Sequence, residues 1–157
     1  MLKRFSVYTY FAIPVITWLK ITFIALLLQT PLMLKNIEVS FKETFRIAAF
    51  ANVPYILLGL IKLVFLFVTP RSDYSSDLLT LIPGSITNLI SKESYSAVAL
   101  SFLSNINVYE ILWIIFVFIG IAQLKKLSKQ DSFILAFSVW LGLTLFQFGL
   151  VLYFNKA

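Results

Sequence analysis

The stretch from Ser40 to Thr69 most constrains how this chain folds, because its pattern indicates a helix that crosses a membrane. Between residues 47 and 68 the only strongly polar side chains are Asn52 and Lys62. At about 1.5 Å of rise per residue, such a run is long enough to cross a hydrocarbon core roughly 30 Å thick. We therefore predict a membrane span over residues 46–69.

One face of this predicted helix collects its small and polar residues. With 3.6 residues per turn, that face carries Ala48, Asn52, Tyr55, Gly59 and Lys62. In lipid, small residues allow close helix packing, while buried amide and ammonium groups need protein partners. We expect this face to point into a helical bundle, with Asn52, Tyr55 and Lys62 in a polar seam and with Ala48 and Gly59 at packing positions.

Composition extends the membrane prediction to the whole chain. Hydrophobic residues make up 60% and charged residues only 13%, whereas about a quarter of a soluble domain is charged. A chain of 157 residues has room for four or five spans and no separate soluble domain. We predict an all-α, polytopic membrane helical bundle in one domain, 1–157, with further spans at 8–28, 109–124 and 133–154.

The charged and reactive residues restrict the function. The thirteen Lys and Arg residues are scattered between apolar segments, which favours a role in membrane topology over nucleic-acid binding. Histidine and cysteine are absent, which removes the commonest general base, the thiolate nucleophile and the usual soft metal ligands. We therefore expect no enzyme activity, no metal, no cofactor and no nucleic-acid partner.

Lys20 falls near the middle of the first predicted span, where a lipid-facing charge is costly. Three interpretations stay open. Lys20 can snorkel toward the membrane surface, it can meet a structural partner inside the bundle, or it can contact an ion or a substrate. Each places it among the candidate polar residues of the bundle.

Acidic residues near the predicted spans have capping explanations. Ser40 and Glu43 have the spacing of a capping box, and Asn107 stands three residues before Glu110. For Glu110 we favour capping over catalysis, although a helix turned inward also brings Lys62 within its reach. Asp131 or Ser132 is expected to cap the last helix, whose Ser138, Gly142 and Gly149 share a face suited to packing.

Two breaks interrupt the helical pattern. Pro54 deprives the carbonyl of Phe50 of its donor, which predicts a kink beside Asn52. The segment 78–104 is apolar but is divided by Pro83-Gly84 and by charged residues. It is expected to be interfacial or re-entrant, with a fifth irregular span as the alternative.

Basic residues predict the orientation. The linker 31–45 and the loop 125–132 are rich in lysine, whereas the segment 70–107 holds more acids than bases. Four spans place the two basic loops on one side, which the positive-inside rule assigns to the cytoplasm. Lys3 and Arg4 near the N-terminus favour the opposite orientation.

Part of the chain resembles the bacterial branch of the Yip domain family. The resemblance covers Phe41, Phe45, Arg46, Ile47, Ala48, Ala49, Ala51 and Pro54, the Pro83-Gly84-Ser85 patch, and the Ile106-Asn107-Val108-Tyr109 stretch before Trp113. It implies a bundle of about five spans in the bacterial inner membrane. In eukaryotes the family is linked to Rab-type GTPases and vesicle traffic. Bacterial members mostly lack an assigned role, so the resemblance implies a fold more than a function.

Two functions remain open. The first is a non-catalytic scaffold or accessory factor, embedded in the lipid bilayer, that binds a membrane-protein partner or a second copy of itself. The second is a small transporter or channel subunit, because charged groups inside spans often line pathways. For either function, the candidate residues are Lys20, Asn52, Tyr55, Lys62 and Glu110.

Overall fold

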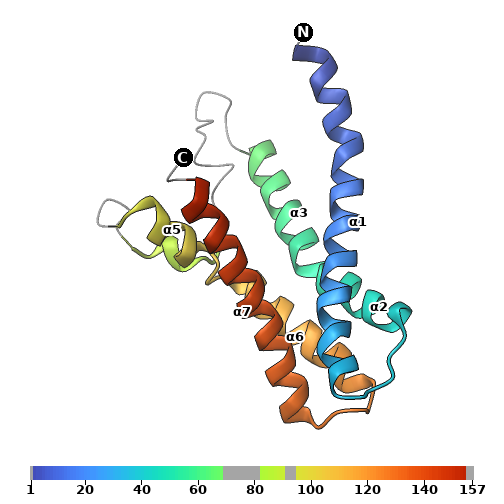
Figure 1. Ribbon diagram of the computed structural model, residues 1–157. Coiled ribbons are helices and arrows are strands. Elements are labelled where there is room, and N and C mark those ends of the chain that lie inside the picture. Colours follow the sequence, from blue (N-terminus) through green and yellow to red (C-terminus); the bar gives the residue numbers. More distant parts are fainter. Residues whose placement is uncertain (1, 69–81, 91–94, 155–157) are drawn as a thin grey trace.

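The computed structural model describes residues 2–68, 82–90 and 95–154, and most of these residues are helical (Figure 1). In chain order the helices are α1 (Leu2–Leu34), α2 (Phe41–Ala51), α3 (Val53–Val68), the 3₁₀ turn η2 (Ile86–Asn88), α5 (Ala97–Ser104), α6 (Val108–Gln123) and α7 (Lys129–Phe154). The β-structure within the described ranges is one isolated bridge, between Ser85 and Asn107. The predicted all-α fold is confirmed.

The helices pack in the order α1, α2, α6 and α7, with α3 rising from the end of α2 (Figure 1). Their common core consists of buried aliphatic residues and one tryptophan: Ile24, Ala25, Leu28, Ile47, Ala48, Ala51, Trp113, Val117, Ile121, Ala136 and Val139. Alanines on three helices let the backbones approach closely. The core therefore lies where α2 is held between α1 and α6.

The kink predicted near Pro54 is confirmed as a complete break between α2 and α3. The backbone N–H of Asn52 donates to Ala49 at 3.1 Å, one residue short of the α-helical partner. The side-chain amide of Asn52 donates instead to the carbonyl of Ala48 at 2.7 Å. The amide therefore supplies the hydrogen bond that the broken backbone does not make.

Three helices, and not four, are long and apolar enough to cross a membrane. They are Ala12–Leu34, Phe41–Phe65, counted across the break, and Lys129–Tyr153. The helix predicted as the span 109–124 has 16 residues, or about 24 Å of length. Its ends are fixed by the Asn107 cap and by Lys125, whose positive φ of 55° cannot continue a helix. The prediction of four full-length spans is therefore corrected.

The first helix continues beyond residue 28, where we expected the span to end. Pro31 lies inside α1, and the helix runs on to Leu34. Proline removes one backbone hydrogen bond, but the next residue, Leu32, is only 1% exposed, and its burial favours continuing the helix. Asn36, in the left-handed conformation with φ of 54°, follows the end of the helix.

The last helix begins earlier than predicted. Its cap is Ser128 rather than Asp131 or Ser132, because Ser128 Oγ accepts from the backbone N–H of Asp131 at 3.0 Å. Ser128 also donates to the Asp131 carboxylate at 2.6 Å. Ser40 and Glu43 form the predicted capping box at the start of α2. Both patterns place an acid three residues after a serine, so the spacing was informative in each case.

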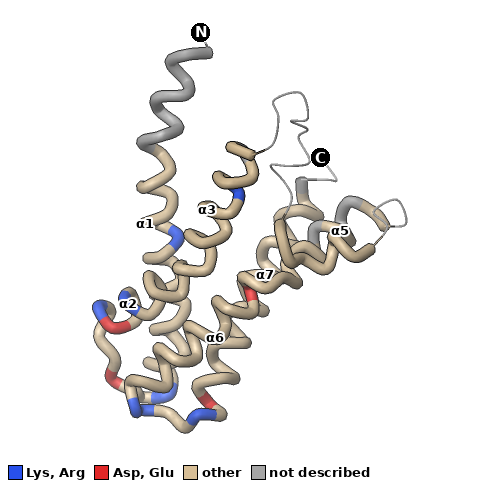
Figure 2. The backbone as a smooth tube through the Cα atoms, turned by 180° about the vertical axis from the view of Figure 1, so that it is seen from behind, with Lys and Arg blue, Asp and Glu red and all other residues tan. Residues whose placement is uncertain are grey.

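Many of the charged residues lie at one end of the bundle (Figure 2). Two loops meet there: Lys35 is 3.5 Å from Asp131, and the ammonium group of Lys126 donates to the backbone carbonyl of Glu38. The linker 31–45 and the loop 125–132 therefore lie on the same side, as their lysines predicted. We refer to this end as the basic end.

The segment 78–104 lies only partly within the described residues. Its described parts are η2 and α5, and α5 has eight residues, which give about 12 Å of helix. Gly84, with φ of 75°, turns the chain so that the N–H of Ile86 reaches the carbonyl of Ile106 at 3.1 Å. The choice between an interfacial and a re-entrant segment depends partly on residues outside the described ranges.

Candidate functional site: a polar cavity between four helices

The carboxylate of Glu110 joins three helices. Tyr55 of α3 donates its hydroxyl hydrogen to Oε1 at 2.7 Å, and the indole N–H of Trp140 on α7 donates to Oε2 at 3.0 Å. The backbone N–H of Glu110 is capped separately by Asn107 at 2.9 Å. The predicted N-cap at Asn107 is therefore confirmed. The carboxylate of Glu110 takes no part in this cap and accepts hydrogen bonds from two other helices.

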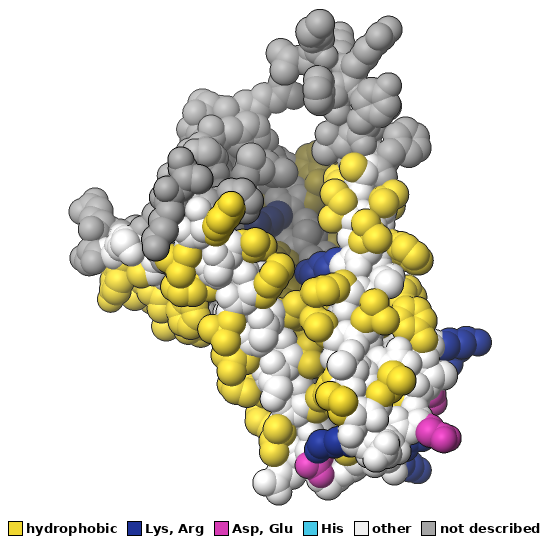
Figure 3. All heavy atoms as spheres, in the orientation of Figure 1, with side chains coloured by type: hydrophobic (Ala, Val, Ile, Leu, Met, Phe, Trp, Pro, Cys, Tyr) yellow, Lys and Arg dark blue, Asp and Glu magenta, His cyan; other side chains and the backbone are white. Residues whose placement is uncertain are grey.

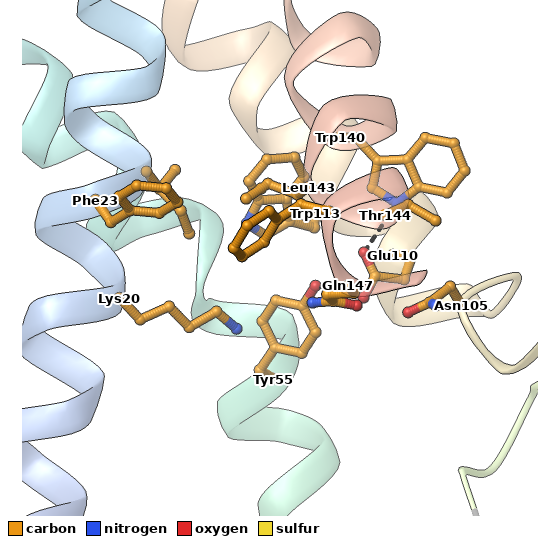
Figure 4. Close-up of a pocket in the computed structure, with 12 residues that line it drawn as sticks. Lys20, Phe23, Tyr55, Asn105, Glu110, Trp113, Trp140, Leu143, Thr144 and Gln147 are labelled. Carbon is orange, nitrogen blue, oxygen red and sulfur yellow. Dashed lines mark hydrogen bonds between the residues drawn. The ribbon is translucent and has the colours of Figure 1, made fainter. Parts of the chain in front are cut away.

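Lys20 approaches the same group through the ring of Tyr55. Its ammonium nitrogen lies 4.3 Å from the centre of that ring, within the range of a cation–π interaction. In Figure 4, Tyr55 lies between Lys20 and Glu110, and the lysine side chain extends from α1 toward the ring. The sequence placed these three residues on three separate helices, and the fold brings them together.

A cavity of about 270 Å³ surrounds this cluster. Residues from α1, α3, α6 and α7 line it, with Asn105 from the turn before α6: Lys20, Phe23, Ile24, Tyr55, Asn105, Glu110, Trp113, Trp140, Leu143, Thr144, Phe146 and Gln147 (Figure 4). Within the described ranges, Lys20 and Glu110 form no ion pair. The cavity thus holds one cation and one anion that do not contact each other directly.

Two residues of the predicted seam lie outside this cluster. Asn52 turns its amide back to its own helix, as described above, and Lys62 does not line the cavity. The predicted ion pair between Lys62 and Glu110 does not occur within the described ranges, where the ion pair that forms is Lys35–Asp131. Asn52 lies at the break between α2 and α3, so the face that looked continuous in sequence belongs to two helices.

The predicted packing positions also differ from those observed. Ala48 is fully buried, but an added Cβ at Gly59, Gly142 or Gly149 would meet no described atom within 4 Å, and Ser138 is exposed. Close packing involves Gly120 instead, where an added Cβ would lie 2.7 Å from Cγ2 of Ile47. Small residues permit close approach, but only the partner helix decides which of them is used.

The contribution of α7 to the cavity was not expected from the sequence. Trp140, Thr144 and Gln147 follow one another at spacings of four and three, so they share one face of a helix. Thr144 is 5% exposed, and all three residues line the cavity. This polar stripe could have predicted the contribution of α7. The prediction for this helix was based instead on the face that carries Gly142 and Gly149.

A second, apolar groove lies beside the cavity, between α1 and α7. It has a volume of about 360 Å³ and is lined by Phe23, Leu27, Pro31, Leu135, Ser138, Val139, Gly142, Leu143 and Phe146. Phe23, Leu143 and Phe146 belong to both spaces. Figure 3 shows the face on which α1 and α7 lie, with basic side chains in the hollow between apolar ones.

The polar side chains of the cluster offer charges and hydrogen-bonding groups to a ligand. No group of three or more Asp and Glu residues able to hold a metal occurs in the described part of the chain. Trp113 is buried, and its indole N–H has no acceptor among the described residues. Because this nitrogen is not accessible, it does not face the open part of the cavity. The groups that face the cavity are an ammonium, a carboxylate and neutral side chains.

Comparison of the chain with models of protein families, with curated proteins and with solved structures found no match.

Proposed function

We propose that this membrane protein is a non-catalytic, multi-pass scaffold or accessory factor, related in fold to the Yip domain proteins that its sequence resembles. The observation that carries the proposal is that the carboxylate of Glu110, which faces the cavity, is already hydrogen-bonded to other helices. Both of its oxygens accept hydrogen bonds from neutral side chains of other helices. A carboxylate held in this way links helices and stabilises their packing. A general base, in contrast, must be free to accept a proton from a substrate.

The other acids beside the apolar helices support the same proposal. Glu43 completes a capping box, and Asp131 bonds to Ser128 and lies 3.5 Å from Lys35. Each of these contacts stabilises a helix end or links two loops. The absence of histidine and cysteine from the sequence further favours a role without chemistry.

Exposed apolar faces offer surfaces for lipid and for a partner in the membrane, which we propose to be the bacterial inner membrane. On α3, Ile56, Leu60 and Val64 are each at least 55% exposed and recur every four residues. Such a stripe is solvated by lipid or covered by another helix, either of a partner or of a second copy. A scaffold needs a surface of this kind.

The test is co-purification of the full-length protein from native membranes, paired with flux measurements in proteoliposomes. A scaffold gives a partner, or a second copy, at fixed stoichiometry and gives no flux above that of empty liposomes. Replacing Ile56 and Leu60 by alanine should release the partner, whereas replacing Ile115 on α6, which is also exposed, should not. A protein that is always purified alone as a monomer contradicts the proposal.

A small transporter or channel subunit is the second candidate, favoured by the cavity beside Lys20. Charged groups that face a cavity inside a membrane often mark a pathway. Flux of a small anion that depends on Lys20, measured as its loss in Lys20→Gln, would replace the scaffold with this candidate.

A further inference from the structure

We propose that the cavity and the groove together bind one phospholipid whose headgroup carries a primary ammonium next to its phosphate, with the phosphate at Lys20, the ammonium at Glu110 and an acyl chain between α1 and α7. This site goes beyond the scaffold role and does not depend on it. Three features of the molecule point to it: the charges of the cavity, the position of the groove beside it and the direction of both within the bilayer.

The ammonium group of Lys20 has room for a further partner. It contacts the ring of Tyr55 and makes no direct contact with an anionic oxygen among the described residues. An ammonium held within a span without a contacting anion is costly, and a phosphate oxygen gives it a strong, charge-assisted hydrogen bond. The Lys20 side chain is exposed on α1, so a ligand can reach its ammonium group.

The charges that line the cavity balance each other. Lys20 and Glu110 face the cavity together, so its formal charge is zero. A headgroup with one positive and one negative charge leaves that balance unchanged, whereas an anionic headgroup brings a second negative charge near Glu110. The two oxygens of Glu110 each accept one hydrogen bond at present and keep lone pairs for an ammonium. The rings of Tyr55 and Trp140 add cation–π attraction.

The apolar groove lies next to the cavity. The two spaces share Phe23, Leu143 and Phe146, so a headgroup in the cavity has an apolar groove beside it. Gly142 leaves the groove open, because a side chain there would meet no described atom within 4 Å. A polar space next to an apolar one fits an amphiphile better than it fits a free ion.

Lys20 lies in the half of the bilayer remote from the basic end. About 22 Å of helix separates Lys20 from Lys35 at the basic end, which is more than half of a hydrocarbon core about 30 Å thick. From the cavity, the groove extends past Leu27 and Pro31, toward the basic end. A lipid of the leaflet remote from the basic end fits this arrangement, with its headgroup at Lys20 and its chain pointing toward the bilayer centre.

The experiment is native mass spectrometry of the full-length protein in detergent, titrated with phosphatidylethanolamine, phosphatidylcholine and phosphatidylglycerol of identical acyl chains. Phosphatidylethanolamine should bind roughly tenfold more tightly than either of the others, a difference of about 1.4 kcal/mol. Phosphatidylcholine lacks ammonium hydrogens to donate, and phosphatidylglycerol lacks the ammonium. Equal binding of the three lipids overturns the proposal.

Variants locate the headgroup. Lys20→Gln should weaken phosphatidylethanolamine binding by roughly tenfold, while Lys62→Gln, a lysine in a span outside the cavity, should leave it unchanged. In Glu110→Gln the preference over phosphatidylglycerol should disappear. Because Glu110 also joins helices, the Glu110→Gln variant is first checked for native helicity by circular dichroism. Only the ratio of its affinities for phosphatidylethanolamine and phosphatidylglycerol is then compared with that of the wild type. If Glu110→Gln does not fold, the result with Lys20→Gln decides. Equal losses in the two lysine variants contradict the assignment.

A glycine pair locates the acyl chain. Gly142→Phe fills the groove and should weaken binding of all three lipids, whereas Gly59→Phe, which also faces open space but lies on α3 outside both spaces, should not. Binding that is indifferent to Gly142→Phe removes the groove from the site and overturns the proposal as stated.

Discussion

Tyr55 and Glu110 are joined by a hydrogen bond of 2.7 Å although 55 positions of sequence separate them. The bond ties α3 to the first turn of α6. The same carboxylate accepts a second bond, from Trp140 of α7 at 3.0 Å. One side chain thus fixes the relative positions of three helices on one side of the cavity, and this arrangement leads to the first two predictions.

Replacing Tyr55 by phenylalanine should lower the stability of the bundle. The variant keeps the ring beneath Lys20 and removes only the hydroxyl donor, so the expected loss is about 0.5–2 kcal/mol. The free energy of unfolding, measured by titration with a denaturing detergent, gives the value. Tyr95→Phe, at an exposed site away from the cluster, is the matched control. Equal stability of the two variants would remove the bond as a stabilising contact.

A pair of double-mutant cycles should separate the observed partner of Glu110 from the one that the sequence suggested. Tyr55→Phe and Glu110→Gln should be coupled by about 0.5 kcal/mol or more, because each removes the same hydrogen bond. Lys62→Met and Glu110→Gln should add to within about 0.5 kcal/mol. Strong coupling in the lysine cycle, with additivity in the tyrosine cycle, would restore the original pairing and contradict the structure.

Gly120 should not tolerate even alanine. Its Cβ would lie 2.7 Å from Cγ2 of Ile47, so α2 and α6 would have to move apart, at a cost of about 1–3 kcal/mol. Ile47→Val should not relieve the contact if it retains the clashing methyl group, but Ile47→Ala should recover part of the loss. Gly149→Ala is the control: it meets no described atom and should be neutral or stabilising by up to about 1 kcal/mol from helix propensity.

The orientation of the basic end can be tested by labelling, because the chain contains no cysteine. A cysteine at Ser128, in the cap at the basic end, should resist a membrane-impermeant thiol reagent in intact cells and react after the cells are broken. A cysteine at Ser75, which lies outside the described residues, should react in intact cells, as the positive-inside rule predicts. The reverse pattern would invert the topology.

Local features of this protein followed from its sequence because they depend on neighbours a few residues apart. The capping box of Ser40 and Glu43, the N-cap at Asn107 and the break near Pro54 each involve hydrogen bonds within one turn of helix. Membrane character likewise depends on composition summed over a stretch of chain. Even so, the end of α1 and the start of α7 were misplaced by one to two turns: the burial of Leu32 favours continuing α1, and the start of α7 depends on which serine caps it.

The polar cluster was only half visible in sequence, because helical periodicity assigns a residue to a face but cannot say which helix that face meets. Lys20, Tyr55 and Glu110 were each candidates, yet Trp140 was missed and Lys62 was chosen as the partner of Glu110 in place of Tyr55. The break at Asn52 divides the predicted span into α2 and α3, and α7 comes from a distant part of the chain. Distances between helices depend on packing, and only the tertiary structure decides them.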